Sequence, residues 1–86
     1  MTATYAGVYR QYATLSGSAG VAHVNRFAET DSRRERYMVT DPRGNIVAVC
    51  WRHGIPDDRE PGMVPWLDGG WTRALAIAEQ CAEAAP

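Results

Sequence analysis

The chain has 86 residues, of which 45% are hydrophobic and 22% charged, and its formal net charge is −1. This length allows one small domain, and this composition excludes disordered, collagen-like and membrane-embedded classes of protein. We therefore predict a single α+β domain spanning residues 1–86, with a small core and little room for a deep pocket.

An amphipathic helix is the first predicted element. Apolar side chains recur at the spacing that lines one face of a helix, and they are Tyr5, Val8, Tyr9, Tyr12 and Leu15. We expect this helix to run from about Thr4 to Leu15. Gly17 would end it, because glycine readily takes the left-handed backbone conformation that follows many helices.

The segment of residues 19–30 fits two structures. As a helix it buries Val21, Val24 and Phe27 on one face; as a strand it joins the hairpin that follows, which then does not stand as an isolated pair. The predicted order is therefore α-β-β-β-α, with α-α-β-β-α as the alternative. In both, an N-terminal helix precedes a hairpin or three-stranded antiparallel sheet, and a C-terminal helix packs on that sheet.

A β-hairpin with its turn at residues 41–44, Asp-Pro-Arg-Gly, is the clearest element in the sequence. These residues are typical of a type I turn followed by a glycine with positive φ. The turn places Val39 opposite Val47 and Tyr37 opposite Val49. One face of the hairpin then carries Tyr37, Val39, Val47, Val49 and Trp51, and the other carries Arg36, Met38, Thr40, Ile46, Ala48 and Cys50. Both faces of the hairpin are then fairly apolar, so either both are covered or one is offered to a partner.

A long loop and a helix complete the chain. Residues 53–70 are rich in proline and glycine and show no periodic pattern, and a loop of that length usually signals function or mobility. After the loop, a helix from Trp71 to Ala84 is expected to pack on the sheet through one apolar face. That face is formed by Trp71, Ala74, Leu75, Ala78, Cys81 and Ala82.

Residues that could hold a metal or attack a substrate are present but do not form a motif. Cys50 and His53 have a spacing seen in zinc sites, and Cys81 and His23 could complete four ligands. Zinc sites, however, normally use two tightly spaced pairs of ligands. No phosphate-binding loop or nucleophile elbow is visible. We therefore expect no metal, no cofactor, no small-molecule substrate and no enzymatic activity.

The sequence also predicts where the protein works. Its longest apolar run, Ile46 to Trp51, is far shorter than a membrane-spanning helix, and its N-terminus does not read as a secretory signal. Because Cys50 and Cys81 fall in apolar patterns, we expect reduced cysteines and a cytoplasmic protein that does not act on membranes. All nine basic residues are arginine, which we take as a trace of a GC-rich bacterial or phage genome.

Nucleic-acid binding is the alternative function. An arginine-bearing hairpin could follow a phosphate backbone as a wing. The candidate residues are Arg26, Arg33, Arg34, Arg36 and Arg43. Acidic residues lie between these arginines. The same pattern is also explained by a mixed-charge sheet edge, which discourages aggregation between sheets.

Binding to another protein, or self-association, is the predicted function. Tryptophan is enriched at the centres of protein interfaces, and the chain has three tryptophans, one of them within the long loop. We expect a small accessory or regulatory protein that binds through this loop and one face of the hairpin. The candidate contact residues are Met63, Trp66 and Leu67 in the loop, and Met38 and Ile46 in the hairpin.

Overall fold

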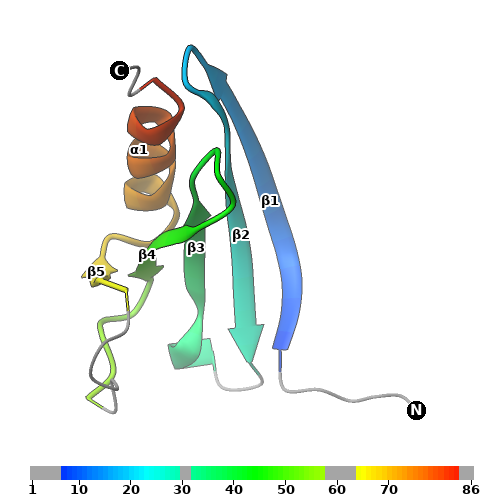
Figure 1. Ribbon diagram of the computed structural model, residues 1–86. Helices are drawn as coiled ribbons and strands as arrows, with labels where there is room; N and C mark the ends of the chain where they lie inside the picture. The colour runs from blue at the N-terminus through cyan, green and yellow to red at the C-terminus, as the bar shows by residue number, and fades with distance from the viewer. Residues whose placement is uncertain (1–6, 30–31, 58–63, 84–86) are drawn as a thin grey trace.

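The computed structural model of the protein describes residues 7–29, 32–57 and 64–83 (Figure 1). These residues form one five-stranded sheet and one α-helix, a β-rich α+β domain. The elements in chain order are β1 (Gly7–Gly17), β2 (Gly20–Glu29), the 3-10 helix η1 (Ser32–Arg34), β3 (Arg36–Thr40), β4 (Ile46–Trp51), β5 (Trp66–Asp68) and α1 (Gly70–Glu83).

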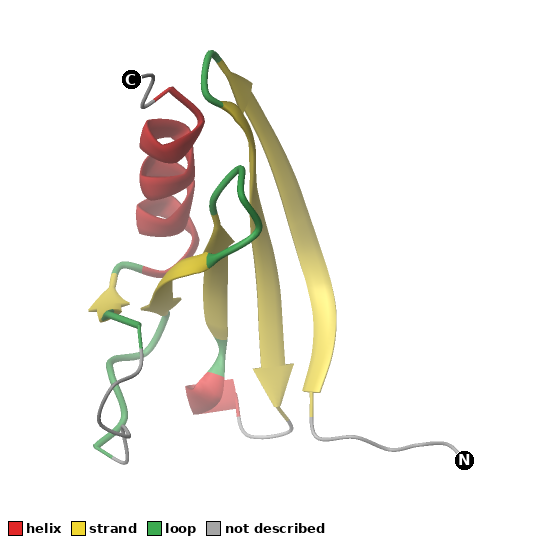
Figure 2. Ribbon diagram, in the orientation of Figure 1, coloured by secondary structure: helices red, strands yellow, loops and turns green. Residues whose placement is uncertain are grey.

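The sheet is mixed, with strands in the order β1-β2-β3-β4-β5. The first four strands form an antiparallel meander, whereas β5 pairs with β4 in parallel. The backbone amide of Val49 donates a 3.0 Å hydrogen bond to the carbonyl of Pro65 and so begins the contact with β5. The long β1–β2 hairpin stands at one side of the molecule and the short β5 at the other (Figure 2).

The predicted N-terminal helix is wrong, and with it the predicted α-β-β-β-α order and its alternative. The described part of residues 4–15 lies in β1, while residues 4–6 fall outside the described residues. The helical spacing put Tyr12 and Leu15 on one face, whereas alternation along the strand puts them on opposite faces. Ala13 and Leu15 pack on the core, whereas Tyr12, Thr14 and Ser16 are exposed. Tyrosine, valine and threonine favour strands, and pairing with β2 decides between the two patterns.

The ambiguous segment is strand β2, as the argument from its neighbours indicated. It pairs with β1 on one side and with β3 on the other. Ala22 and Val24 point into the core and are fully buried, which is the alternation expected of a strand with one face on a helix.

The hairpin of β3 and β4 forms where predicted, but its register differs. The amide of Gly44 donates to the carbonyl of Asp41, as in a type I turn, and Gly44 has a φ of 93°, as expected of the glycine after that turn. A bulge at the start of β4 then shifts the pairing, so that Val39 lies opposite Ala48 and Tyr37 opposite Cys50. Because a shift of one residue moves side chains to the other face, Val49 and Trp51 point away from the face predicted for them.

The core lies between one sheet face and α1. The helix begins one residue before the predicted start and buries the predicted face, with Ala74, Ala78 and Ala82 fully enclosed. These small side chains let the helix approach the sheet closely. Its C-terminal turn is held by the β1–β2 turn, where the backbone amide of Ala19 donates a 2.7 Å hydrogen bond to the carbonyl of Ala82.

Replacing Gly17 with alanine is expected to lower the free energy of unfolding by about 2 kcal/mol, a typical cost of overpacking. A Cβ atom at Gly17 would lie 2.5 Å from the carbonyl oxygen of Ala82, and backbone cannot move aside as a side chain does. Urea denaturation measures the change, with Ser18→Ala in the same turn as the control. An unchanged unfolding midpoint for Gly17→Ala would contradict this close approach.

Candidate functional site

An apolar groove lies on the sheet face opposite α1, which we call the outer face. Its volume is about 340 Å³. The groove, called the outer groove below, is lined by Arg34, Arg36, Met38, Ile46, Val49, Trp51, Val64 and Trp66. Two of these residues are arginines and the other six are apolar. The groove therefore offers a surface on which apolar side chains of a ligand would lose their contact with water.

Two tryptophans from different strands form one side of the groove. The rings of Trp51 and Trp66 pack with their centroids 4.7 Å apart. Trp51 is 1% exposed, whereas Trp66 is half-buried. The parallel pairing of β5 with β4 holds this pair together, because it places Trp66 opposite Val49, two residues before Trp51.

Arginine side chains complete the groove around Trp51. The guanidinium groups of Arg34 and Arg36 each lie 5.3 Å from its ring centroid, at cation–π distance. Arg36 also lies over Phe27 at 4.3 Å and donates a hydrogen bond to the carbonyl of Arg34. These contacts fix the arginines as parts of the groove wall.

Three of the five predicted protein-contact residues come together in this groove: Met38, Ile46 and Trp66. Ile46 is the most accessible of them, with 46% of its surface exposed. Leu67 does not belong to the site, because alternation along β5 turns it to the opposite face, where it packs against the core. Met63 lies outside the described residues.

The five arginines predicted for nucleic acid do not all lie on one surface. Arg33 and Arg34 lie on η1, before β3, and Arg43 lies in the turn after β3, so the strand separates them. Arg34 and Arg36 both line the outer groove. Arg26 is tied into an ion pair, with its Nε 2.8 Å from a carboxylate oxygen of Glu35.

That carboxylate is the most polar feature of the interior. Glu35 is 3% exposed and accepts hydrogen bonds from the Arg26 guanidinium, the Tyr37 hydroxyl and the Arg52 guanidinium. These donors, Arg26 first, lower the pKa of Glu35 to about 2. Burial and the nearby carboxylate raise the pKa of Tyr37. The cluster is saturated with internal partners and is best explained as a structural feature.

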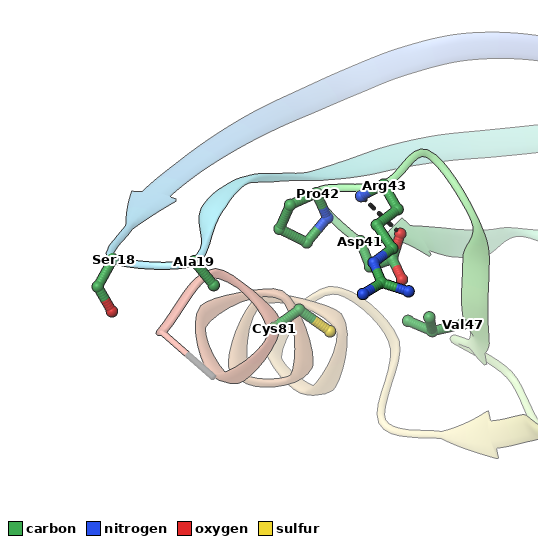
Figure 3. A pocket seen from close by; sticks show the side chains of 7 residues that line it. All are labelled: Ser18, Ala19, Asp41, Pro42, Arg43, Val47 and Cys81. Carbon is green, nitrogen blue, oxygen red and sulfur yellow. Dashed lines mark hydrogen bonds between the residues drawn. The ribbon is translucent and has the colours of Figure 1, made fainter. Parts of the chain in front are cut away.

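A second hollow lies between the two hairpin turns and the helix (Figure 3). It has a volume of about 480 Å³ and is lined by Ser18, Ala19, Asp41, Pro42, Arg43, Val47 and Cys81. One carboxylate oxygen of Asp41 already accepts hydrogen bonds from the backbone amides of Arg43 and Asn45. Burial, and then Asp41, raise the pKa of the Cys81 thiol. A protonated thiol is a poor nucleophile, so this hollow has few groups for catalysis.

The residues considered for a metal are not brought together. Within the described ranges, no group of three or more histidine, cysteine or acidic side chains is placed to hold an ion. Cys50 is buried beneath the helix and burial raises the pKa of its thiol, while His53 is exposed in the loop after β4. Both cysteines are free thiols.

Sequence reasoning missed five residues of the outer groove as members of a protein-binding site: Arg34, Arg36, Val49, Trp51 and Val64. Val49 and Trp51 were placed on the wrong face because the bulge in β4 is invisible in the turn sequence. Arg34 and Arg36 were considered only for nucleic acid. Val49 and Trp66 lie on neighbouring strands, so only a prediction of β5 would have placed them side by side. Three residues are too few to give a strand signal in the sequence.

Comparison of this chain with protein-family models, with curated proteins and with solved structures gave no match. Within the described residues, α1 is too short and too polar to cross a bilayer, as the sequence predicted.

Proposed function

We propose that this protein binds another protein through the outer groove. The observation that carries the proposal is an open groove with six apolar lining residues on the sheet face that α1 leaves uncovered. Exposed apolar surface of this kind costs free energy in water unless a ligand covers it. Tryptophan and methionine, both present here, are favoured at the buried centres of interfaces.

The geometry suits a short protein segment that inserts one or two large apolar side chains. Trp66 and Ile46 form accessible parts of the wall, and Met38 offers a flexible side chain that adapts to different shapes. Arg34 and Arg36 stack on aromatic rings at the groove, where they exclude water around such an anchor. Recognition would therefore depend mainly on apolar contact.

We further propose that the binding takes place in the cytoplasm of a bacterial or phage-infected cell, as an accessory or regulatory interaction. The two free thiols support a reducing compartment. Nucleic-acid binding receives less support, because β3 separates Arg43 from Arg33 and Arg34, and Arg26 is paired with Glu35.

Ile46→Asp tests the proposal. A peptide library displayed on phage is selected on the wild-type protein, and the enriched peptides are titrated against purified variants. We expect peptides with large apolar residues, and we expect Ile46→Asp to weaken their binding by about tenfold or more, since it places a charge in the groove where the ligand is desolvated.

Ile55→Asp is the matched control. Ile55 is 39% exposed and does not line the groove, so the same substitution there should leave peptide affinity unchanged. Equal losses in both variants, equal retention in both, or failure to enrich any peptide would contradict the proposal.

A further inference from the structure

The two edges of the sheet differ in how well they are protected. Edge strands expose unpaired backbone amides and carbonyls, and proteins usually shorten or cover them. At one edge, β5 has only three residues. At the other edge, β1 has eleven residues and, within the described part of the chain, pairs with β2 alone. β1 is thus the longer template for an added strand.

The C-terminal half of β1 is regular and uncharged. The bulge lies between Tyr9 and Tyr12, and from Tyr12 to Gly17 every residue pairs in register with β2. This stretch contains neither proline nor a charged residue, two common guards of an exposed edge.

The backbone groups of Thr14 face outward from the sheet. Gly17 and Gly20 pair directly across the turn between β1 and β2. Hydrogen-bonded and non-hydrogen-bonded pairs alternate along an antiparallel ladder. Counting from Gly17 and Gly20 as the bonded pair that closes the turn, Leu15 also bonds to β2. The amides and carbonyls of Tyr12, Thr14 and Ser16 then point to the open side.

We propose that β1 pairs antiparallel with β1 of a second copy of this chain, about a two-fold axis at Thr14. This axis, perpendicular to the sheet, sets Thr14 opposite the second copy's Thr14 and Tyr12 opposite its Ser16. Threonine pairs across antiparallel strands are favourable. Both copies then place their helices on the same side, and the two five-stranded sheets join edge to edge.

The position of α1 supports a second copy of this chain as the partner that pairs with β1. The helix lies beside the C-terminal end of β1, where Gly17 contacts Ala82, and leaves the N-terminal end uncovered (Figure 1). In the antiparallel arrangement each helix-covered end lies beside the other copy's uncovered end. The outer grooves lie toward the far edges and stay accessible, so the inference is independent of the proposed function.

Thr14→Lys is the test variant, because it sets two like charges opposite each other on the axis. Light scattering after size-exclusion chromatography over a range of concentrations should show the wild type at twice 9.5 kDa, and Thr14→Lys should weaken self-association by about tenfold or more. Gln80→Lys, an equal change on the exposed side of α1, should leave it unchanged.

Amide hydrogen exchange of the wild type gives a second readout that needs no variant. In the dimer the Thr14 amide should exchange as slowly as the amide of Leu15; in a monomer it should exchange far faster. A monomeric wild type, a fast-exchanging Thr14 amide, or a dimer that Ile46→Asp dissociates and Thr14→Lys does not would each overturn the proposal.

Discussion

Trp51→Ala is expected to lower the free energy of unfolding by about 4 kcal/mol, as large core truncations do. Trp51 is 1% exposed and is enclosed by Trp66 and by the guanidinium groups of Arg34 and Arg36. Small domains have only about 5–15 kcal/mol of total stability, so the variant would be close to unfolding at room temperature. Urea denaturation followed by far-ultraviolet circular dichroism measures the loss.

Trp51→Phe separates the packing of the ring from its polar atom. The indole Nε1 of Trp51 is buried and has no hydrogen-bond partner among the described residues. Phenylalanine removes this unsatisfied donor and keeps an aromatic ring, so its expected cost is about 1 kcal/mol. An equal loss for the two variants would show that packing of the ring does not account for the effect.

Glu35→Gln is expected to lower the free energy of unfolding near neutral pH by about 3 kcal/mol, the size of its pKa shift converted to free energy. The pKa of Glu35 is about 2 in the folded protein, against an ordinary value of 4.5, first because of the Arg26 guanidinium and then of Tyr37 and Arg52. The charged carboxylate thus favours the folded state at every pH above 4.5.

The pH dependence has a defined sign. Because the folded pKa lies below the unfolded one, the stabilisation is complete above about pH 4.5 and is lost as the pH falls towards 2. Urea denaturation of wild type and Glu35→Gln at a series of pH values should therefore give curves that converge on acidification. Glu79→Gln, on the exposed side of α1, is the control. A constant difference between the two curves across this range would contradict the assignment.

Local signals in the sequence identified two elements correctly. The Asp-Pro-Arg-Gly turn defined the β3–β4 hairpin because proline and glycine restrict the backbone at specific turn positions. The alanine-rich sequence of residues 71–84 defined α1 and its buried face because helix propensity and apolar spacing agree there. In both cases the information lies within a few neighbouring residues.

The remaining elements depend on contacts between distant residues. β1 carries a spacing compatible with a helix, and only its pairing with β2 makes it a strand. β5 is three residues long and exists because β4 offers it an edge. The bulge that turns Trp51 to the outer face is likewise not signalled by the turn residues. Met38, Ile46 and Trp66 could therefore be named from their chemistry, but the groove they share could not.

The contact between the first hairpin and the last helical turn bears on the synthesis of this protein. β1 and β2 leave the ribosome first, whereas α1, which covers Ala22 and Val24, follows only after the other strands. The nascent sheet therefore exposes its apolar face until α1 has also left the ribosome, and contacts between such distant residues form slowly. During this interval the growing chain presents transiently exposed apolar surface, which makes nascent proteins prone to aggregate.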